Sequence, residues 1–178
     1  MKNLIIIGHP DKRSFCYNGI MKTIQQTLKE NKEETYVLDL YKENITFEFT
    51  KDKIKKYKDL ITWADRIYII SPVWWFRCTP ATEAFFDQRF TPGFAYKFVP
   101  VTKVYGYPKP LLSDKKVRTY LTHGAPALPV LTLYLNSVKL RLVMGVYSFV
   151  FGWLKLKQDN FGVYHLFHKI KGWYIWRK

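Results

Sequence analysis

The chain has 178 residues, of which 48% are hydrophobic and 24% charged, a balance that is ordinary for a folded protein and argues against disorder. This length is enough for one domain with a real core, so residues 1–178 are expected to form a single domain. A net charge of +15 indicates an anionic partner, and an aromatic content of 18% favours a pocket for a flat ligand, an apolar interface, or both.

Several classes of protein and partner are disfavoured. The chain has only Cys16 and Cys78, and Met1 leads directly into a strand pattern without a signal peptide, so we expect a reduced, cytoplasmic protein. No apolar run reaches the roughly 20 residues of a spanning helix. No nucleic-acid-binding module is recognisable, so nucleic acid is not an expected partner. The positive charge leaves open a peripheral contact with the anionic inner face of a membrane, or with a membrane protein.

Strand and helix patterns alternate along the chain. Continuous apolar runs and period-two alternation indicate strands, and apolar stripes at helical spacing indicate helices. Strands are predicted at residues 3–7, 35–40, 66–70, 116–122 and 153–163. Helices are predicted after Ser14 as N-cap, after Thr50 as cap over 51–64, over 80–90, over 137–150 with Gly152 at C′, and as a short helix within 165–178. Residues 91–114 are predicted to be one long loop.

This alternation predicts an α/β fold with a doubly wound parallel sheet and right-handed crossovers. Ligands bind outside the carboxyl ends of the strands in such sheets. That rule selects the three loops that follow the first, third and fourth strands, residues 8–15, 71–79 and 123–127. What these loops contain is therefore the functional question.

The first loop presents basic and hydroxyl side chains at a helix start, namely His9, Lys12, Arg13 and Ser14. A helix N-terminus with such side chains favours a phosphate, although Ser14 could serve only as a cap and Arg13 only face solvent. Neither a Gly-x-Gly-x-x-Gly turn nor a Walker loop is present.

The second and third loops have a different character. Trp74, Trp75 and Phe76 form a platform for a planar ligand, or alternatively pack the core or a subunit face. The third loop offers the Thr122 hydroxyl and close backbone approach at Gly124. A ligand that needs a phosphate site at one loop, ring stacking at another and hydrogen bonds at the third is a flavin nucleotide.

A set of short motifs over roughly residues 1–125 carries a resemblance to a known family. The motifs are Gly8-His-Pro-x-x-x-Ser14-Phe15, Ser71-Pro-Val-Trp-Trp-Phe76, Pro80-Ala-x-x-x-x-Phe86-Asp-x-x-Phe90, Gly93-Phe-Ala-Tyr96, Leu111 through Lys116, and Thr122-x-Gly124. With these motifs the chain resembles the NAD(P)H:quinone oxidoreductase family, which includes modulator-of-drug-activity and potassium-efflux ancillary proteins. The resemblance implies a flavodoxin-like, five-stranded parallel sheet of order 2-1-3-4-5 with helices on both faces.

The resemblance also implies a cofactor, a reaction and a set of site residues. Bound FMN, or alternatively FAD, would take hydride from NAD(P)H and reduce a quinone or similar acceptor by a ping-pong mechanism, in a homodimer. No metal site is implied. The implied residues are His9, Arg13, Ser14 and Phe15 at the phosphate; Pro72, Val73, Trp74, Trp75 and Phe76 at the ring; Thr122, His123 and Gly124 at its edge; and Tyr96 and Phe98 at the substrate.

Three departures from the family pattern bear on substrate and mechanism. Cys16 stands where the family usually has Asn, and Trp74 replaces a commonly polar residue beside the ring. The family's Thr-Gly-Gly turn has become Thr122-His-Gly-Ala-Pro126, which makes His123 the only nearby candidate for a catalytic proton donor. An alternative function on the same fold is a regulatory flavoprotein that docks on a membrane transporter, such as a potassium-efflux system.

Overall fold

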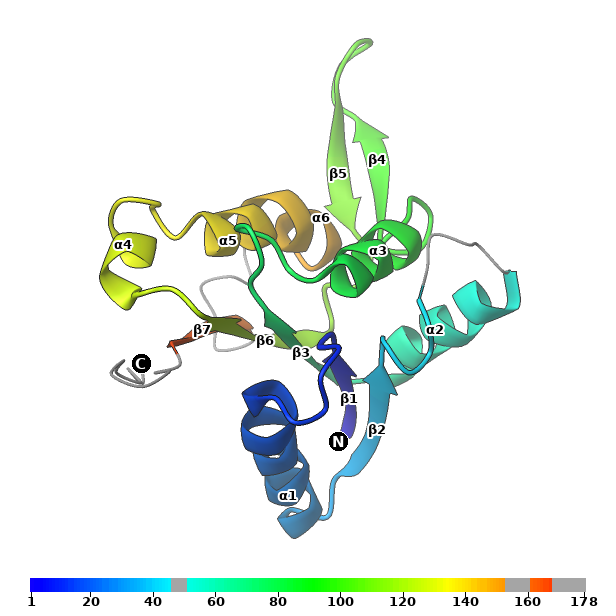
Figure 1. The fold of residues 1–178 in the computed structure, drawn as a ribbon. Coiled ribbons are helices and arrows are strands. Elements are labelled where there is room, and N and C mark those ends of the chain that lie inside the picture. The colour runs from blue at the N-terminus through cyan, green and yellow to red at the C-terminus, as the bar shows by residue number, and fades with distance from the viewer. Residues whose placement is uncertain (46–50, 153–160, 168–178) are drawn as a thin grey trace.

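A parallel sheet with helices on both faces forms the centre of the protein (Figure 1). The structure, a computed structural model, describes residues 1–45, 51–152 and 161–167. The strands of the sheet are β1 (Lys2–Ile7), β2 (Glu34–Asp39), β3 (Arg66–Pro72), β6 (Lys116–His123) and β7 (Phe161–Phe167). They lie in the order β2-β1-β3-β6-β7, and every neighbouring pair is parallel. The predicted fold class and strand order 2-1-3-4-5 are therefore confirmed.

The alternation of side chains along β1 divides the core into two layers. Ile5 and Ile7 face the layer covered by η1 (Cys16–Met21) and α1 (Lys22–Glu30). Leu4 and Ile6 face the opposite layer, which contains buried side chains of α2 (Lys51–Trp63) and α3 (Pro80–Arg89). Because both faces of the strand are covered, β1 reads as an unbroken apolar run in the sequence.

A helical segment follows β6, and its part from Ser137 onward covers the second layer as well. It consists of α4 (Ala127–Leu131), α5 (Ser137–Leu140), η2 (Arg141–Tyr147) and α6 (Ser148–Val150). The last three run on without a break, which confirms the predicted helix over 137–150, although its middle is a π-helix. Gly152 has a φ of +93° and its amide donates to the Tyr147 carbonyl at 3.1 Å, so the predicted C′ glycine is confirmed.

The prediction of one long loop over residues 91–114 is wrong in its central part. An antiparallel hairpin occupies it, formed by β4 (Tyr96–Pro100) and β5 (Gly106–Pro110), and it projects away from the sheet (Figure 1). The sequence did not predict these strands because Pro100, Pro108 and Pro110 argue against them: proline lacks the amide N–H that a central strand needs. A two-stranded ribbon has two free edges, so it tolerates proline there.

Four smaller predictions are also corrected or fall outside the described residues. β3 continues through Pro72, which pairs with Thr122, so the strand predicted at residues 66–70 is two residues longer and the loop after it is shorter. The last strand runs to Phe167 and takes the first residues of the predicted tail helix. The predicted cap Thr50, residues 153–160 of the predicted last strand, and the remainder of the tail lie outside the described residues.

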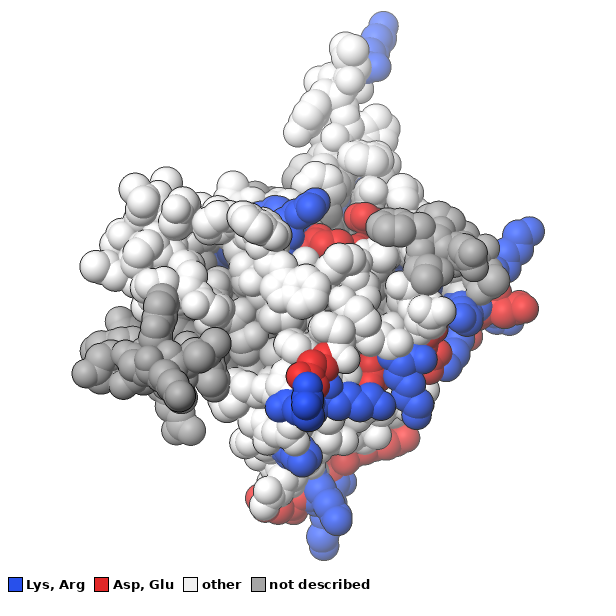
Figure 2. All heavy atoms as spheres, in the orientation of Figure 1, with Lys and Arg blue, Asp and Glu red and all other residues white. Residues whose placement is uncertain are grey.

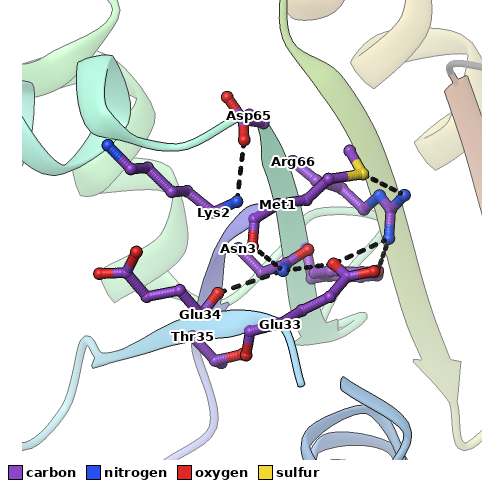
Figure 3. A network of polar contacts seen from close by, with 9 residues as sticks. Met1, Lys2, Asn3, Glu33, Glu34, Thr35, Asp65 and Arg66 are labelled. Carbon is purple, nitrogen blue, oxygen red and sulfur yellow. Dashed lines mark hydrogen bonds and ion pairs between the residues drawn. The ribbon is translucent and has the colours of Figure 1, made fainter. Parts of the chain in front are cut away.

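A polar network fixes the amino ends of three strands, opposite the edge at which ligands are expected (Figure 3). The buried Asn3 side-chain amide donates to the Glu33 carboxylate at 2.7 Å and to the carbonyls of Met1 and Glu34, both at 3.1 Å. The backbone amide of Lys2 donates to Asp65 at 2.8 Å. These bonds tie β1 to the segments that enter β2 and β3, and thereby hold the strands in register.

The helices of the described residues fall short of what a bilayer requires. Among residues 1–45, 51–152 and 161–167, none is both long and apolar enough to cross a membrane.

Candidate functional site

The three predicted loops meet at the carboxyl ends of β1, β3 and β6, and backbone and side-chain contacts join them. The Gly8 amide donates to the Ile70 carbonyl at 2.9 Å, and the Val73 amide donates to the Thr122 carbonyl at 2.9 Å. The Cys16 sulfur lies 3.4 Å from the Thr122 hydroxyl oxygen. Burial raises the pKa of the Cys16 thiol, so this link between η1, directly after the first loop, and the end of β6 is a neutral one.

A buried cluster of hydroxyl groups attaches the first loop to the start of α3. The Thr79 hydroxyl donates to the Gly8 carbonyl at 2.7 Å and lies 3.0 Å from the Thr82 hydroxyl. The Ser71 hydroxyl accepts from the Thr79 amide at 3.3 Å. Thr79 and Thr82 were not among the predicted site residues. Threonines three positions apart in the first turn of a helix were the available signal, since such side chains share one helix face.

The first loop has the donors that a phosphate needs. His9 Nδ1 accepts from the Asp11 amide at 3.0 Å, so the proton of the neutral imidazole is on Nε2, which is free to donate to a ligand. The Ser14 hydroxyl oxygen is buried and has no hydrogen-bond partner among the described residues. A buried hydroxyl without a partner costs free energy, which a ligand oxygen would recover. This orphaned donor fits a phosphate.

One first-loop expectation is wrong, and a second stays a prediction that faces a competing contact. Ser14 does not cap the helix, because Phe15 is the N-cap residue and no side chain makes the capping bond. The Arg13 side chain is 92% exposed and pairs with Asp11 at 3.2 Å, so the described conformation directs its guanidinium to a carboxylate. Arg13 would have to exchange this partner to contact a phosphate.

The Phe15 ring lies across Gly19, where an added Cβ would be 2.3 Å from the ring.

The protonation state of His9 leads to a pH prediction. Burial lowers the pKa of His9, so its neutral form stabilises the folded loop above the ordinary histidine pKa of about 6.5. This contribution is lost as the pH falls through the lower pKa of the folded protein. A proton NMR titration of the imidazole should give a pKa for His9 below that of a denatured control. A pKa at or above the denatured value would contradict the assignment of Nδ1 as an acceptor.

The second loop turns sharply and displays its aromatic side chains. Trp74 and Arg77 exchange backbone hydrogen bonds of 2.8 and 3.0 Å, and the two residues between them have positive φ, +49° at Trp75 and +58° at Phe76. Bulky residues rarely adopt this conformation, which is found at ligand sites more often than elsewhere. Trp75 is 92% exposed, while Phe76 packs against Tyr134 with ring centroids 4.6 Å apart. The aromatic platform thus faces outward and does not belong to the core.

The positive φ at Trp75 predicts opposite effects of one substitution on the stability of the fold and on the affinity for FMN. Replacing Trp75 with glycine should raise the free energy of unfolding by about 1 kcal/mol, because glycine adopts positive φ without steric cost. The same change removes an exposed ring, so the affinity for FMN should fall. Urea unfolding and flavin titration of one preparation measure both effects. Trp63→Gly, in α2, is the control and should lower stability. A Trp75→Gly protein that is less stable than the wild type would contradict the strain argument.

The third loop begins at the end of β6. Thr122 is half-buried, and a Cβ added at Gly124 would meet no atom within 4 Å, so space is open above that backbone. His123 is only 4% exposed, which places its imidazole inside the protein and not beside this open space. Its role as proton donor stays a prediction, and it requires the imidazole to be reached by the substrate. No set of three metal-binding side chains is found among the described residues.

Comparison with known proteins identifies the family. A family model described as flavodoxin-like fold matches residues 1–135. The chain belongs to this flavodoxin-like family. The resemblance noted in the sequence is confirmed at this level.

Relatives of this flavodoxin-like protein have names that concern redox chemistry. An uncharacterized NAD(P)H oxidoreductase of Haemophilus influenzae is 26% identical over 137 residues, which is 70% of this chain and 65% of that protein. The chain thus spans about two thirds of the length of this relative. The structure of an NAD(P)H:quinone oxidoreductase from Methanothermobacter marburgensis aligns with a TM-score of 0.73 and 20% identity, over 97% of this chain and 89% of that one.

A third similarity is to a protein solved with a cofactor. The FMN-dependent NADH-azoreductase of Bacillus anthracis, in complex with FMN, aligns with a TM-score of 0.64 and 17% identity, over 94% of this chain and 87% of that one. At these identities the structural comparisons establish the fold.

The predicted substrate residues lie apart from the three loops in this flavodoxin-like chain. Tyr96 and Phe98 belong to β4, where their rings meet edge to face with centroids 5.6 Å apart. Tyr96 also meets Phe149 and lines a cleft of about 350 Å³ between α3, β4 and η2–α6. No described hydrogen bond or ring contact joins Tyr96 or Phe98 to the three loops. Their substrate role therefore stays a prediction.

Proposed function

We propose that this protein is a flavin-dependent oxidoreductase that transfers hydride from NAD(P)H through FMN to a quinone or similar acceptor, with the two substrates using one site in turn. The observation that carries the proposal is the meeting of the three loops at one sheet edge. The orphaned Ser14 hydroxyl, the outward aromatic turn and the open face at Gly124 correspond to the phosphate, ring and edge of one flavin nucleotide.

Each loop has a separate task. When bound, FMN supplies the two-electron chemistry that no side chain of the protein can supply. The Ser14 hydroxyl and His9 Nε2 would hold the phosphate, with Arg13 joining them after leaving Asp11. Trp74 and Trp75 would cover the ring and exclude water from one face, while backbone at Thr122 and Gly124 would orient its edge. His123 is the candidate proton donor.

FMN is proposed over FAD because the azoreductase relative is named as FMN-dependent and was solved with FMN. NAD(P)H is proposed as the reductant because the Haemophilus relative is named for it. The identity of the acceptor rests on the quinone oxidoreductase name of the Methanothermobacter protein, and a quinone is a planar substrate that an aromatic wall accommodates.

Two measurements test the proposal. The purified protein should be yellow or should take up added FMN, and mass spectrometry should identify the flavin that denaturation releases. It should then oxidise NADH or NADPH in the presence of menadione faster than free FMN does at the same concentration. A colourless protein that takes up no flavin would exclude this function. Flavin binding without turnover above free FMN would instead favour the regulatory flavoprotein docked on a membrane transporter.

We also propose a homodimer in the cytoplasm. Its support is the group of exposed apolar side chains that follows the third loop, since single-chain proteins rarely display so many together. They are Leu128, Leu131, Leu133, Tyr134, Leu135, Leu140 and Met144. Light scattering during size-exclusion chromatography should give twice the chain mass of 21.3 kDa. The Leu133→Asp variant should have the mass of a single chain.

A further inference from the structure

The β4–β5 hairpin has an unusual charge distribution for a surface element. Between Asp87 and Asp114 the sequence has no acidic residue, although Lys97, Lys103 and Lys109 all lie in the hairpin or its turn. On the face that Figure 2 shows, the projecting hairpin is largely free of charge along its length, and a basic side chain lies at its end. This contrasts with the lower part of the molecule, where basic and acidic side chains alternate.

Two of these lysines oppose each other directly. In the hairpin register Lys97 pairs with Lys109, and both side chains are exposed. Like charges in directly opposite positions destabilise a two-stranded ribbon. Neither lysine has an acidic partner among the described residues, so nothing in this part of the chain offsets the repulsion. An external anion would offset it.

The same face of the hairpin becomes apolar toward its end. The pair after Lys97 and Lys109 on this face is Val99 with Tyr107, about 7 Å further along because side chains on one face are two residues apart. Beyond it lie Val101, 64% exposed, and Tyr105, 63% exposed. Lysines at the base of this face, with valines and tyrosines toward its end, match the order of groups met on entering an anionic bilayer, and Lys103 in the turn can extend its ammonium group back to the headgroups along its apolar stem.

The end of the hairpin is a closed turn, which presents its apolar side chains in a fixed way. The Val101 amide donates to the Tyr105 carbonyl at 2.9 Å, and the Thr102 hydroxyl accepts from the amides of Val104 and Tyr105 at 3.3 and 3.0 Å. Val104 is 97% exposed and so contributes nothing to packing. A valine held outward by an ordered turn is suited to a contact outside the chain.

We propose that the β4–β5 hairpin docks this protein on an anionic lipid surface. The valines and tyrosines of the hairpin end lie at the boundary between headgroups and acyl chains, and Lys97, Lys103 and Lys109 contact lipid phosphates. The opposite face of the ribbon, with Tyr96 against Pro110, Phe98 against Pro108 and Pro100 against Gly106, has no charged group, and toward its end it has no polar side chain. A protein partner recognised by specific polar contacts would find few here, whereas a lipid surface requires none. This docking does not depend on flavin binding.

Vesicle flotation tests the proposal with the full chain. The wild type should float with vesicles of phosphatidylcholine and phosphatidylglycerol and bind vesicles of phosphatidylcholine alone at least about tenfold more weakly, since each lysine near an anionic surface contributes about fivefold. Val104→Asp should lower the partition to anionic vesicles about tenfold. Val104→Leu, which keeps the apolar group, should bind as well as the wild type.

The charge is tested by a matched pair of double variants. Lys97→Gln with Lys109→Gln should remove most of the preference for anionic vesicles. Lys22→Gln with Lys29→Gln removes the same net charge from α1 and should leave the preference largely in place.

Four results would overturn the proposal, three of them in the vesicle assay. These are wild-type protein that binds neither vesicle, Val104→Asp protein that binds as the wild type does, and equal losses in the two double lysine variants. A Val104→Asp protein of half the wild-type mass would also overturn it, because the hairpin would then be a contact between subunits. Flavin uptake by Val104→Asp protein should equal that of the wild type, so failure of docking and failure of the proposed redox function are separable.

Discussion

Replacing Gly8 with alanine should lower the free energy of unfolding by about 3 kcal/mol, a large loss for one methyl group. An added Cβ would lie 1.9 Å from the Thr82 hydroxyl oxygen and 3.1 Å from that of Thr79. Neither hydroxyl can move freely, since Thr79 donates to the Gly8 carbonyl and Thr82 approaches Ser71 at 3.4 Å. Urea unfolding at equilibrium measures the loss.

The Thr82→Ala background is the control for this prediction. Removing the Thr82 hydroxyl relieves the closest contact, so adding Gly8→Ala there should cost less than it does in the wild type. A further comparison is Gly145→Ala, because a Cβ at that helical glycine meets nothing within 4 Å and alanine favours a helix. Equal losses for Gly8→Ala in both backgrounds would show that the hydroxyl cluster does not set the position of the first loop.

Replacing Gly124 with leucine should weaken FMN binding at least about tenfold, equivalent to about 1.4 kcal/mol, while the free energy of unfolding changes by less than about 0.5 kcal/mol. The position is exposed, its φ is not positive, and space above it is open. A large side chain would therefore fold without strain and fill the space proposed for the ring edge. Flavin fluorescence titration and urea unfolding of the same protein separate the two effects.

Gly145→Leu is the matched control for Gly124→Leu. It places the same side chain at another open glycine, in the cleft that Tyr96 and Phe149 line. FMN affinity should be unchanged in this variant. If Gly145→Leu weakens binding and Gly124→Leu does not, the ring lies in that cleft and the three-loop site is wrong.

The sheet and the three loops could be predicted because their signals are local and repeated. Apolar runs such as residues 3–7 mark strands buried on both faces, and the alternation of strands with helices allows few topologies. The carboxyl-end rule then selects the loops without any side-chain detail. The sequence therefore predicted which segments meet at the site.

The details that the sequence did not predict depend on contacts between distant residues. Whether Ser14 caps a helix or leaves its hydroxyl free depends on where η1 begins, and Asp11 competes with any ligand for Arg13. The positive φ values at Trp75 and Phe76 are set by the bonds between Trp74 and Arg77. The burial of His123 follows from side-chain alternation along β6, which places it on the face opposite Thr122.

The outward turn at Trp74 and Trp75 gives this protein a built-in optical probe. The Trp75 indole is almost wholly in water, so its emission should be red-shifted and open to collisional quenching by iodide or acrylamide. Indole emission overlaps flavin absorption, and a ring that settles against this turn would take up that energy. Occupancy of the site can therefore be followed in unlabelled protein through the decrease of tryptophan fluorescence and through protection of the Trp75 indole from the quencher.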